Sequence, residues 1–284
     1  MIRRHGLTLA GVLAIGAASC SDPTGPGSAP FCAHRPDSAV IEIEDANFDL
    51  SIRSALSVSP QLDLTCGMVE GITSLNAPSR GIVSLSGIEN LTGLTTLWIR
   101  ANAITDITPL RGLTGLTSLN LAANRIQDIE PLRALTQLTF LAINENGAIA
   151  DIAALSALTN LTGTLWMGGN LIEDIEPLRA LTGISVLRAW DNSITDLSPL
   201  SSLSGLTELH VHTNAITDTD GLAALSALTA VSLHTNPELT DIRGLIDNAA
   251  LGPGTDVNLS GTSVSCADVD ALAAKGVAVI SDCP

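Results

Sequence analysis

The sequence predicts an α/β solenoid, in which short coils of chain stack side by side and each coil holds one strand and one helical turn. Three observations carry this prediction. A motif of about 22 residues recurs about nine times, apolar residues alternate before a recurring asparagine, and an aspartate and a proline follow that asparagine. Self-similarity at such a period is typical of stacked repeat architectures, in which each unit buries its apolar residues against its neighbours.

The stretch LTSLNLAANRIQDIEPL at residues 116–132 shows one copy of the motif. Apolar residues stand eight, five and three positions before Asn124 and two, five and eight positions after it, with Asp128 and Pro131 between them. The same frame recurs, in some copies with a one-residue insertion, around Asn102, Asn146, Asn170, Asn192, Asn214 and Asn236, with Arg80 and Thr262 at the asparagine position of the first and last copies.

Each coil is expected to begin with a strand. In LTTLWIRAN, Leu97 and Ile99 alternate with Trp98 and Arg100, so the strand has one apolar face and one mixed face. The asparagine then falls where the chain must turn. Its amide can satisfy backbone groups of the neighbouring coil, so a ladder of such residues would connect successive coils.

The second half of each coil is expected to hold a helical turn. An aspartate precedes the proline-containing segment, where its carboxylate can cap the first free amides, and proline is tolerated in a first turn. Calcium binding by the row of carboxylates is the alternative, but the clustered acidic loop of dedicated calcium sites is not present in the sequence. The row consists of Asp106, Asp128, Asp151, Asp174, Asp196, Asp218 and Asp241.

The pattern in LTGLTTLWIRANAITDITPL resembles the leucine-rich repeat, specifically the bacterial internalin-like type, and the resemblance covers residues 69–262. It implies a curved stack with a parallel sheet on the concave side and short helical or 3₁₀ segments outside. It also favours a protein as the partner, although the sequence itself does not separate a protein from a glycan.

The N-terminal residues predict export. Residues 1–19 have two arginines, an apolar stretch and small residues, which is typical of a signal peptide. The segment also resembles a bacterial lipoprotein signal, in which Cys20 would carry the lipid, although Ala17 stands where such signals prefer leucine. Residues 20–30 are expected to be a flexible tether. The predicted location is the bacterial cell envelope, as an outer-membrane or cell-surface lipoprotein, with ordinary secretion as the alternative.

The four remaining cysteines predict two disulfides, one at each end of the solenoid. Nine strands spaced by about 4.8 Å separate the two ends by roughly 40 Å, far beyond the distance of about 4.4 to 6.8 Å that a disulfide allows between α-carbons. Only the pairs Cys32–Cys66 and Cys266–Cys283 are therefore possible. They would lie in an N-terminal cap at residues 31–68 and a C-terminal cap at residues 263–284.

Each cap is expected to contain one helix. In NFDLSIRSAL, the side chains of Phe48, Ile52, Ala55 and Leu56 would share one apolar face. In the C-terminal cap, Ser265 with Asp268 three residues later resembles a capping box, and Gly276 would stop the helix.

Functional residues are expected where the coils differ, on the strand positions six, four, two and one before the asparagine. All three tryptophans of the chain stand there. Trp and Arg contribute much of the binding energy in protein interfaces. The ligand-binding candidates are Trp98, Arg100, Phe140, Asn144, Trp166, Gly168, Arg188, Trp190, His210, His212 and His234. Between Trp166 and Trp190, Gly168 is expected to leave a dent for an apolar side chain or a sugar.

Two other function classes are less favoured. His210, His212 and His234 would lie close enough on neighbouring strands to share a metal ion, but exposed histidines are more often polar surface. No cofactor is expected, and an enzyme is not predicted, because no phosphate loop, nucleophile elbow or zinc-protease motif is present. The net charge of −16 makes nucleic acid a poor partner. A purely structural envelope protein without a specific ligand remains the rival hypothesis.

Overall fold

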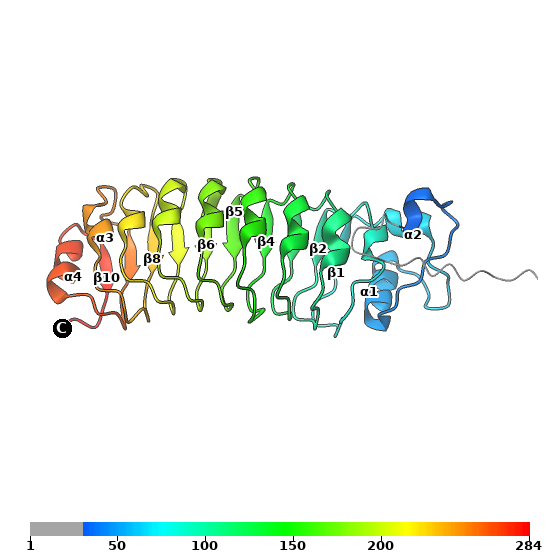
Figure 1. Ribbon diagram of the computed structural model, residues 1–284, viewed down its shortest axis with the longest axis horizontal. Helices are drawn as coiled ribbons and strands as arrows, with labels where there is room; N and C mark the ends of the chain where they lie inside the picture. The colour runs from blue at the N-terminus through cyan, green and yellow to red at the C-terminus, as the bar shows by residue number, and fades with distance from the viewer. Residues whose placement is uncertain (1–30) are drawn as a thin grey trace, which may run out of the picture.

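The computed structural model describes residues 31–284, which form one elongated solenoid with the two caps at opposite ends (Figure 1). The predicted signal peptide, Cys20 and the tether lie outside the described residues. Within residues 31–284, no helix has the length and apolar character needed to cross a bilayer.

The strands form one open parallel sheet in which every strand pairs with the next one along the chain. This linear order confirms the predicted α/β solenoid. Nine strands lie in the predicted repeat region, and the C-terminal cap adds a tenth. The strands are β1 (Ser74–Asn76), β2 (Thr96–Trp98), β3 (Ser118–Asn120), β4 (Phe140–Ala142), β5 (Gly163–Trp166), β6 (Ile184–Arg188), β7 (Glu208–His210), β8 (Ala230–Ser232), β9 (Asp256–Asn258) and β10 (Ala278–Ile280).

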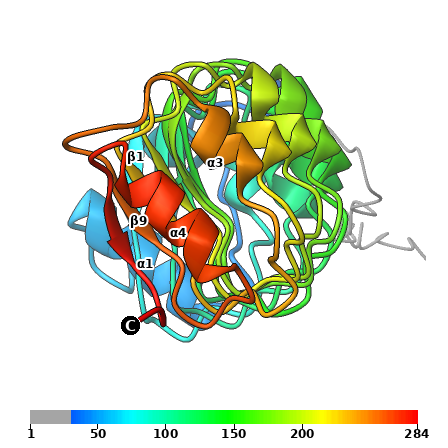
Figure 2. The same ribbon diagram turned by 90° about the vertical axis from the view of Figure 1, so that its left-hand side faces the viewer.

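Helical segments line the side of the solenoid that lies opposite the strands (Figure 2). Most are single 3₁₀ turns, which suits a segment that must reverse within a short coil. They are η2 (Ile88–Asn90), η3 (Thr108–Gly112), η4 (Glu130–Ala134), η5 (Ala153–Ala157), η6 (Glu176–Ala180), η7 (Ser198–Ser202), η8 (Asp220–Leu222) and the α-helix α3 (Arg243–Asp247). The caps contribute η1 (Phe31–His34), α1 (Ala46–Leu56), α2 (Cys66–Glu70) and α4 (Cys266–Ala273).

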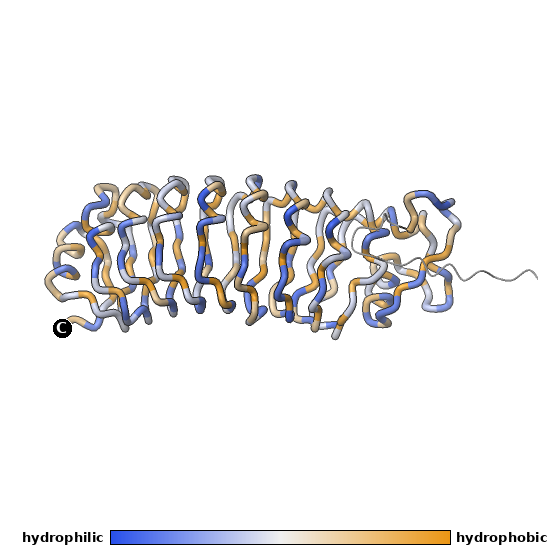
Figure 3. The backbone as a smooth tube through the Cα atoms, in the orientation of Figure 1, coloured by the Kyte–Doolittle hydropathy of each residue, from blue (hydrophilic) through white to orange (hydrophobic). Residues whose placement is uncertain are grey.

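The core runs through the whole solenoid between the strands and the helical segments. The strand residues five and three positions before each asparagine are buried, as are the apolar residues of the helical turns. Apolar and polar segments therefore alternate around every coil in Figure 3. Where Met167 enters this core, the next coil places the small Ala189 at the equivalent position, and both are fully buried.

The asparagine ladder connects the coils as predicted. The Nδ2 of Asn124 donates to the carbonyl of Leu121 in its own coil at 3.0 Å and to that of Ile99 in the preceding coil at 3.1 Å. Its Oδ1 accepts the N–H of Ile104 at 3.2 Å. The residue before each asparagine adopts a left-handed conformation, which turns the chain out of the strand. Alanine, threonine or an acidic residue occupies this position in six of these coils and Gly169 in the seventh, while Gly261 is the equivalent residue before Thr262.

The aspartates cap the helical turns, also as predicted. Each accepts the backbone N–H of the first helical residue, two positions further along, over 2.7 to 3.2 Å. A second ladder was not predicted. Hydroxyl groups at the start of the strands, such as those of Thr117 and Thr139, donate to the carbonyl one coil earlier at 3.1 Å.

The N-terminal cap closes the first coil through a carboxylate that sequence reasoning missed. Asp45 caps α1 by accepting the N–H groups of Asn47 and Phe48, while its other oxygen accepts those of Val83 and Ser84 in the first coil. The disulfide Cys32–Cys66 is present with a Cα–Cα distance of 5.4 Å.

One residue predicted on the buried face of α1 is placed wrongly. Ala55 is exposed, and Ser51 is buried instead, with its hydroxyl donating to the carbonyl of Asn47 at 2.7 Å. The other predicted residues, Phe48, Ile52 and Leu56, pack against the core, the first two completely. The buried stripe therefore follows the spacing of three and four residues, and a serine can join it because its hydroxyl is satisfied within the helix.

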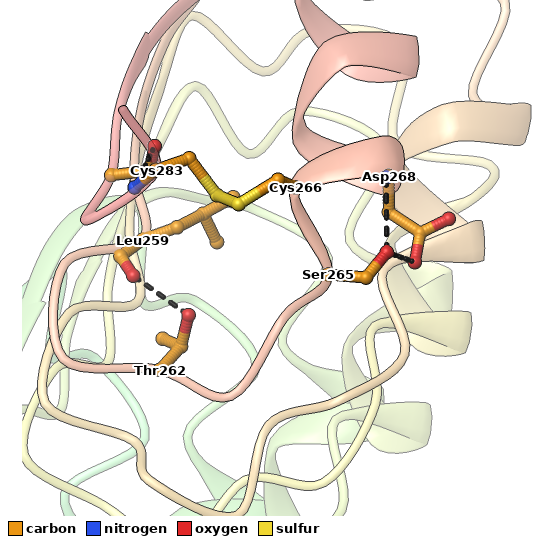
Figure 4. The surroundings of a disulfide bond; sticks show 7 residues. Leu259, Thr262, Ser265, Cys266, Asp268 and Cys283 are labelled. Atoms are coloured by element: carbon orange, nitrogen blue, oxygen red, sulfur yellow. Dashed lines mark hydrogen bonds between the residues drawn. A yellow bond between two sulfur atoms is a disulfide. The ribbon is translucent and has the colours of Figure 1, made fainter.

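The C-terminal cap has the predicted disulfide Cys266–Cys283, with a Cα–Cα distance of 5.5 Å (Figure 4). Ser265 caps α4 by accepting the N–H of Asp268 at 3.1 Å, as its spacing predicts. The helix ends at Ala273, and Gly276 follows with a φ of 88°, so the chain reverses there and continues into β10.

Candidate binding face

The solvent-facing side of the ten-stranded sheet, called the sheet face below, carries three rows of side chains. They lie six, four and two positions before the asparagine of each coil, and the parallel register aligns them from strand to strand. The second row contains Trp98, Asn120, Ala142, Trp166, Arg188, His210 and Ser232. The third row, at the same level of successive coils, contains Arg100, Ala122, Asn144, Gly168, Trp190, His212 and His234. All the predicted ligand-binding residues therefore lie on this face, Phe140 in the first row and the others in the second and third rows.

Three aromatic rings in the N-terminal half make one group, the aromatic cluster. Trp98 and Phe140 have ring centroids 6.3 Å apart, and Phe140 meets Trp166 edge to face at 6.1 Å. Such tilted and edge-to-face pairs are the favoured arrangements of aromatic rings. Trp98 is 42% exposed. The cluster therefore offers an apolar contact surface to solvent.

Small side chains beneath the aromatic cluster allow the rings to lie across neighbouring strands. Trp98 extends over β3, where its indole N–H donates to the hydroxyl of Ser118 at 2.9 Å. Ala142 stands on the solvent side of β4 yet is completely buried, and Asn120 on β3 is buried as well. These small residues were not singled out in the sequence. The sequence feature that could have identified them is their place in the repeat, because they occupy the sheet-face positions of the coils between the aromatic residues.

Arg188 borders the aromatic cluster on the C-terminal side. Its guanidinium carbon lies 5.6 Å from the ring of Trp166, within the range of a cation–π contact. Its Nη2 approaches the carboxylate of Glu208 at 3.8 Å, a long contact between side chains that are both about two-fifths exposed. An exposed pair of this kind contributes little stability, so Glu208 holds the Arg188 guanidinium only weakly.

Three buried polar atoms in this region have no hydrogen-bond partner within the described residues. They are the Oδ1 of Asn144, the Nε1 of Trp166 and the Nε of Arg188. Trp166 and Arg188 are direct neighbours in the sheet register. Buried polar atoms are normally satisfied, so these three atoms are exceptions, and they lie beside the aromatic cluster.

The second group of rings, called the ring stack, consists of Trp190, His212 and His234 in the third row. The planes of Trp190 and His212 are tilted by only 6° with centroids 6.1 Å apart. Those of His212 and His234 are tilted by 11° with centroids 4.2 Å apart. Three planar side chains on successive coils therefore lie nearly parallel, one against the next.

The expected dent at Gly168 is filled by Trp190. A Cβ atom added to Gly168 would stand 2.6 Å from two ring carbons of Trp190 and 2.8 Å from its Nε1. The indole thus lies against the α-carbon of the glycine, and Gly168 itself is buried. The prediction of an open dent was wrong because a large side chain on the next coil leans into the space that the missing side chain leaves.

The surroundings of His212 in the ring stack favour its neutral imidazole. Partial burial lowers the pKa of His212, and the neighbouring His234 and His210 lower it further, while Asp191 acts in the opposite direction. His210 differs from the other two, because its Nε2 lies 3.3 Å from the carboxylate of Glu208. Neither imidazole of the stack has a carboxylate hydrogen-bonded to it within the described residues.

The geometry of the histidines does not favour a metal site. The Nδ1 atoms of His212 and His234 lie 3.3 and 3.1 Å from the hydroxyl groups of Thr213 and Thr235. Lone pairs lie in the plane of an imidazole, so two rings stacked face to face do not direct their nitrogens at one point. In the part of the chain that the structure describes, no group of three or more His, Cys, Asp or Glu side chains could hold an ion.

Arg100 lies apart from both groups of rings. It occupies the third row immediately after β2, and Ala122, Asn144 and Gly168 separate it from Trp190 along that row. Its side chain is exposed. The sheet face therefore carries the aromatic cluster and the ring stack at its centre. Arg100 lies on the N-terminal side of these rings, and Arg188 lies between the two groups.

Comparison with known proteins agrees with the architecture. Residues 114–160 and 182–224 match a family model described as leucine rich repeats (2 copies). Among curated proteins, no sequence matches the chain.

Several solved structures have a similar fold. Internalin C2 of Listeria monocytogenes is 27% identical, with a TM-score of 0.63 over 83% of this chain and 93% of that one. The functional domain of InlJ from the same organism, which includes a cysteine ladder, is 23% identical, with a TM-score of 0.54 over 84% of this chain and 59% of that one. A leucine-rich repeat protein of Leptospira interrogans is 21% identical, with a TM-score of 0.59 over 75% of this chain and 62% of that one.

The last two likenesses concern the fold alone, whereas the first also extends over nearly the whole of a bacterial internalin. Together with the ladder of asparagines and the ten-stranded parallel sheet, they establish the architecture. The chain folds as a leucine-rich repeat solenoid, and its architecture is similar to that of internalin C2.

Proposed function

We propose that this protein is a non-catalytic binding module that recognises a partner protein through its sheet face. The observation that carries the proposal is the concentration of rings there. All three tryptophans of the chain lie on one side of one sheet, together with Phe140 and the stacked histidines. A core built to the size of leucine excludes tryptophan from the interior, but it leaves the loops and the helical side equally open to it.

A protein fits the sheet face better than a small molecule. The rings extend from β2 to the coil of β8, seven successive strands, which at about 4.8 Å each is a length of roughly 30 Å. Such a length suits the contact area of a protein interface. The best-supported contact is an apolar segment of the partner over the aromatic cluster, with an acidic side chain near Arg188 or Arg100.

The same surface gives no support to catalysis as the main role. It is an open, shallow array rather than a closed site, and water would not be excluded from a reacting group there. The shifted pKa of His212 has a sufficient cause in burial and neighbouring imidazoles.

The proposed location is the bacterial cell surface, with the lipid carried by Cys20. Two disulfides support export, because such bonds persist in oxidising compartments. Residues 1–20 supply the lipoprotein-like signal. Replacement of Cys20 by Ser should move the protein from the detergent phase to the aqueous phase in a detergent partition of whole cells. If the native protein already partitions into the aqueous phase, ordinary secretion is correct.

Affinity capture from envelope and culture extracts tests the binding function. The bait is residues 31–284 with a C-terminal tag, because amine coupling would attack Lys275, whose Nζ donates to the carbonyls of Leu245, Ile246 and Asn248. It is compared with a Trp166→Ala/Trp190→Ala variant. A purified partner should then lose at least about tenfold in affinity for the variant, as expected when two interface tryptophans are removed.

The matched control carries two substitutions of apolar side chains off the sheet face. Val83 is 57% exposed and Leu171 is 54% exposed, so Val83→Ala/Leu171→Ala removes comparable exposed apolar groups. The control should bind like the native protein. Equal binding by all three proteins would place the interface elsewhere, and capture of a polysaccharide rather than a protein would assign the sheet face to a glycan. A structural envelope role without a ligand predicts no partner and no phenotype for the tryptophan variant.

A further inference from the structure

The ring stack joins two histidines face to face without a carboxylate on either ring. The centroids of His212 and His234 lie 4.2 Å apart with planes tilted by 11°. Each Nδ1 lies near a threonine hydroxyl, at 3.3 Å for His212 and 3.1 Å for His234. A hydroxyl can donate to or accept from an imidazole, so these contacts suit the neutral rings without supplying a negative charge.

The charged groups around His212 come from three coils. From its own coil, His210 faces it in the adjacent row, and Glu208 pairs with His210 at 3.3 Å. From the preceding coil come Asp191, whose charge favours protonation, and Arg188, which approaches Glu208 at 3.8 Å. From the following coil comes His234. The one carboxylate that acts directly on His212, that of Asp191, is therefore opposed by the two neighbouring imidazoles, His234 and His210.

Around His234 the surroundings are polar and small. The next coil places Ser260 at the equivalent position, and the backbone N–H of Thr235 donates to the carbonyl of Ser260 at 2.8 Å. The nearest strand of that coil, β9, contributes the carboxylate of Asp256 two rows away, at the register position of Ala230. Among residues 31–284, the His234 imidazole has a hydrogen-bonding contact with the hydroxyl of Thr235 and with no side chain of the following coil.

One imidazole of the stacked pair can take up a proton, but a second proton places two positive charges in the stacked rings. Interacting titratable groups lose or gain their protons in separate steps that belong to the pair. The second step opposes the stack, because like charges at this separation repel and neither has a paired anion. His212 also contacts Trp190, so a movement of the imidazoles reaches the indole that lies against Gly168.

We propose that the ring stack is an acid-sensitive part of the binding face, assembled while the imidazoles are neutral and separated when both carry a proton. The inference rests on the proposed function for its consequence, which is release of the partner in acid. Separation of the rings itself is a property of the free protein. It can be measured before any partner is known.

The first experiment uses a Trp98→Phe/Trp166→Phe variant of the full described chain, in which Trp190 is the remaining tryptophan. Its fluorescence and the histidine ring signals in NMR are followed from about pH 8 to about pH 5, the range in which histidine titrates. We expect His212 and His234 to titrate at different midpoints, with the emission of Trp190 changing over the same range. His234→Gln should shift the midpoint of His212 to higher pH.

His34→Gln is the matched control, because His34 lies in η1 of the N-terminal cap, far from the ring stack along the solenoid. It should leave both midpoints and the emission of Trp190 unchanged. Equal midpoints for His212 and His234 that do not respond to removal of the other ring would overturn the proposal. Constant emission from Trp190 through both titrations would overturn it as well.

With a purified partner, the second experiment compares affinity at about pH 7.5 and about pH 5. The native protein should lose about tenfold or more in affinity in acid, and a His212→Gln/His234→Gln variant should lose much less. If the stack separates in the free protein but affinity does not change, the acid-sensitive element is not part of the interface. Failure to find any partner would count against the proposed function and would leave the titration result intact.

Discussion

The indole of Trp190 lies against the α-carbon of Gly168 on the neighbouring strand, so closely that a Cβ atom there would stand 2.6 Å from the ring. This contact fixes the end of the ring stack. It also explains why one coil has a glycine in the third row while its neighbours carry asparagine or rings. The orientation of the stack therefore depends on the fact that Gly168 has no side chain.

Gly168→Ala should displace Trp190 without weakening the fold. Alanine at this strand position has ordinary backbone angles, so the free energy of unfolding should stay within about 1 kcal/mol of the native value. The emission of Trp190 should shift in the Trp98→Phe/Trp166→Phe background. Gly205→Ala is the control, because its nearest neighbouring atom would lie 4.0 Å away. Unchanged emission in the first variant would show that Trp190 is not held by this contact.

The asparagine ladder predicts that Asn214 and Asn170, which occupy equivalent positions, contribute different amounts to the free energy of unfolding. Asn214 accepts the N–H of Ile194 at 2.9 Å and donates to carbonyls of both coils. Asn170 makes the same donations, but its Oδ1 has no partner among the described residues, because the insertion after Asn146 displaces the preceding coil. Asn214→Ala should therefore cost about 1 kcal/mol more than Asn170→Ala in urea unfolding. Equal losses would mean that the accepted hydrogen bond contributes nothing.

The repeat pattern makes most of the fold predictable, because a strict period determines the core rows, the asparagine ladder and the aspartate caps at once. The cysteine pairs follow from the length of the stack. The packing of the rings is not predictable in the same way. Whether Gly168 leaves a dent depends on the direction in which Trp190 leans, and that depends on His212 and on the size of every neighbour. Ser51 and Ala55 show the same limit in the N-terminal cap, where helical spacing alone did not decide which one is buried.

Protonation of Asp45 should reduce the stability of the N-terminal cap in acid. Burial alone would raise its pKa, but the four backbone N–H groups together lower it below the ordinary value of 3.8. Its contribution to stability is therefore fully present above that value and is lost as the pH falls through the lower pKa of the folded state. Asp45→Asn should lower the free energy of unfolding by about 1 to 3 kcal/mol at neutral pH, because two N–H groups lose their acceptor.

The measurement is urea unfolding between about pH 5 and about pH 2.5. The native protein should lose stability more steeply in this range than Asp45→Asn. Asp63→Asn serves as the control, since Asp63 is exposed, and its pH dependence should follow that of the native protein. Parallel curves for the native protein and Asp45→Asn would contradict the role assigned to this carboxylate.

The disulfide Cys266–Cys283 is expected to stabilise the C-terminal cap alone. The bond closes a segment with a sequence separation of 17 residues, for which chain entropy gives about 3 kcal/mol. In Cys266→Ser/Cys283→Ser, hydrogen exchange should accelerate in α4 and β10, while amides of β2 to β8 keep their protection. Acceleration across the whole sheet would show instead that the cap holds the entire solenoid in one cooperative unit.

If a partner contacts the sheet face, side-chain oxidation footprinting of the complex should show where it binds. All three tryptophans report on this face, whereas Leu62, Val83 and Leu171 are exposed apolar residues away from it. We expect Trp98, Trp166 and Trp190 to be protected from oxidation by the partner, and the other three to react as in the free protein. Protection of Leu62, Val83 or Leu171 with no change at the tryptophans would contradict binding at the sheet face.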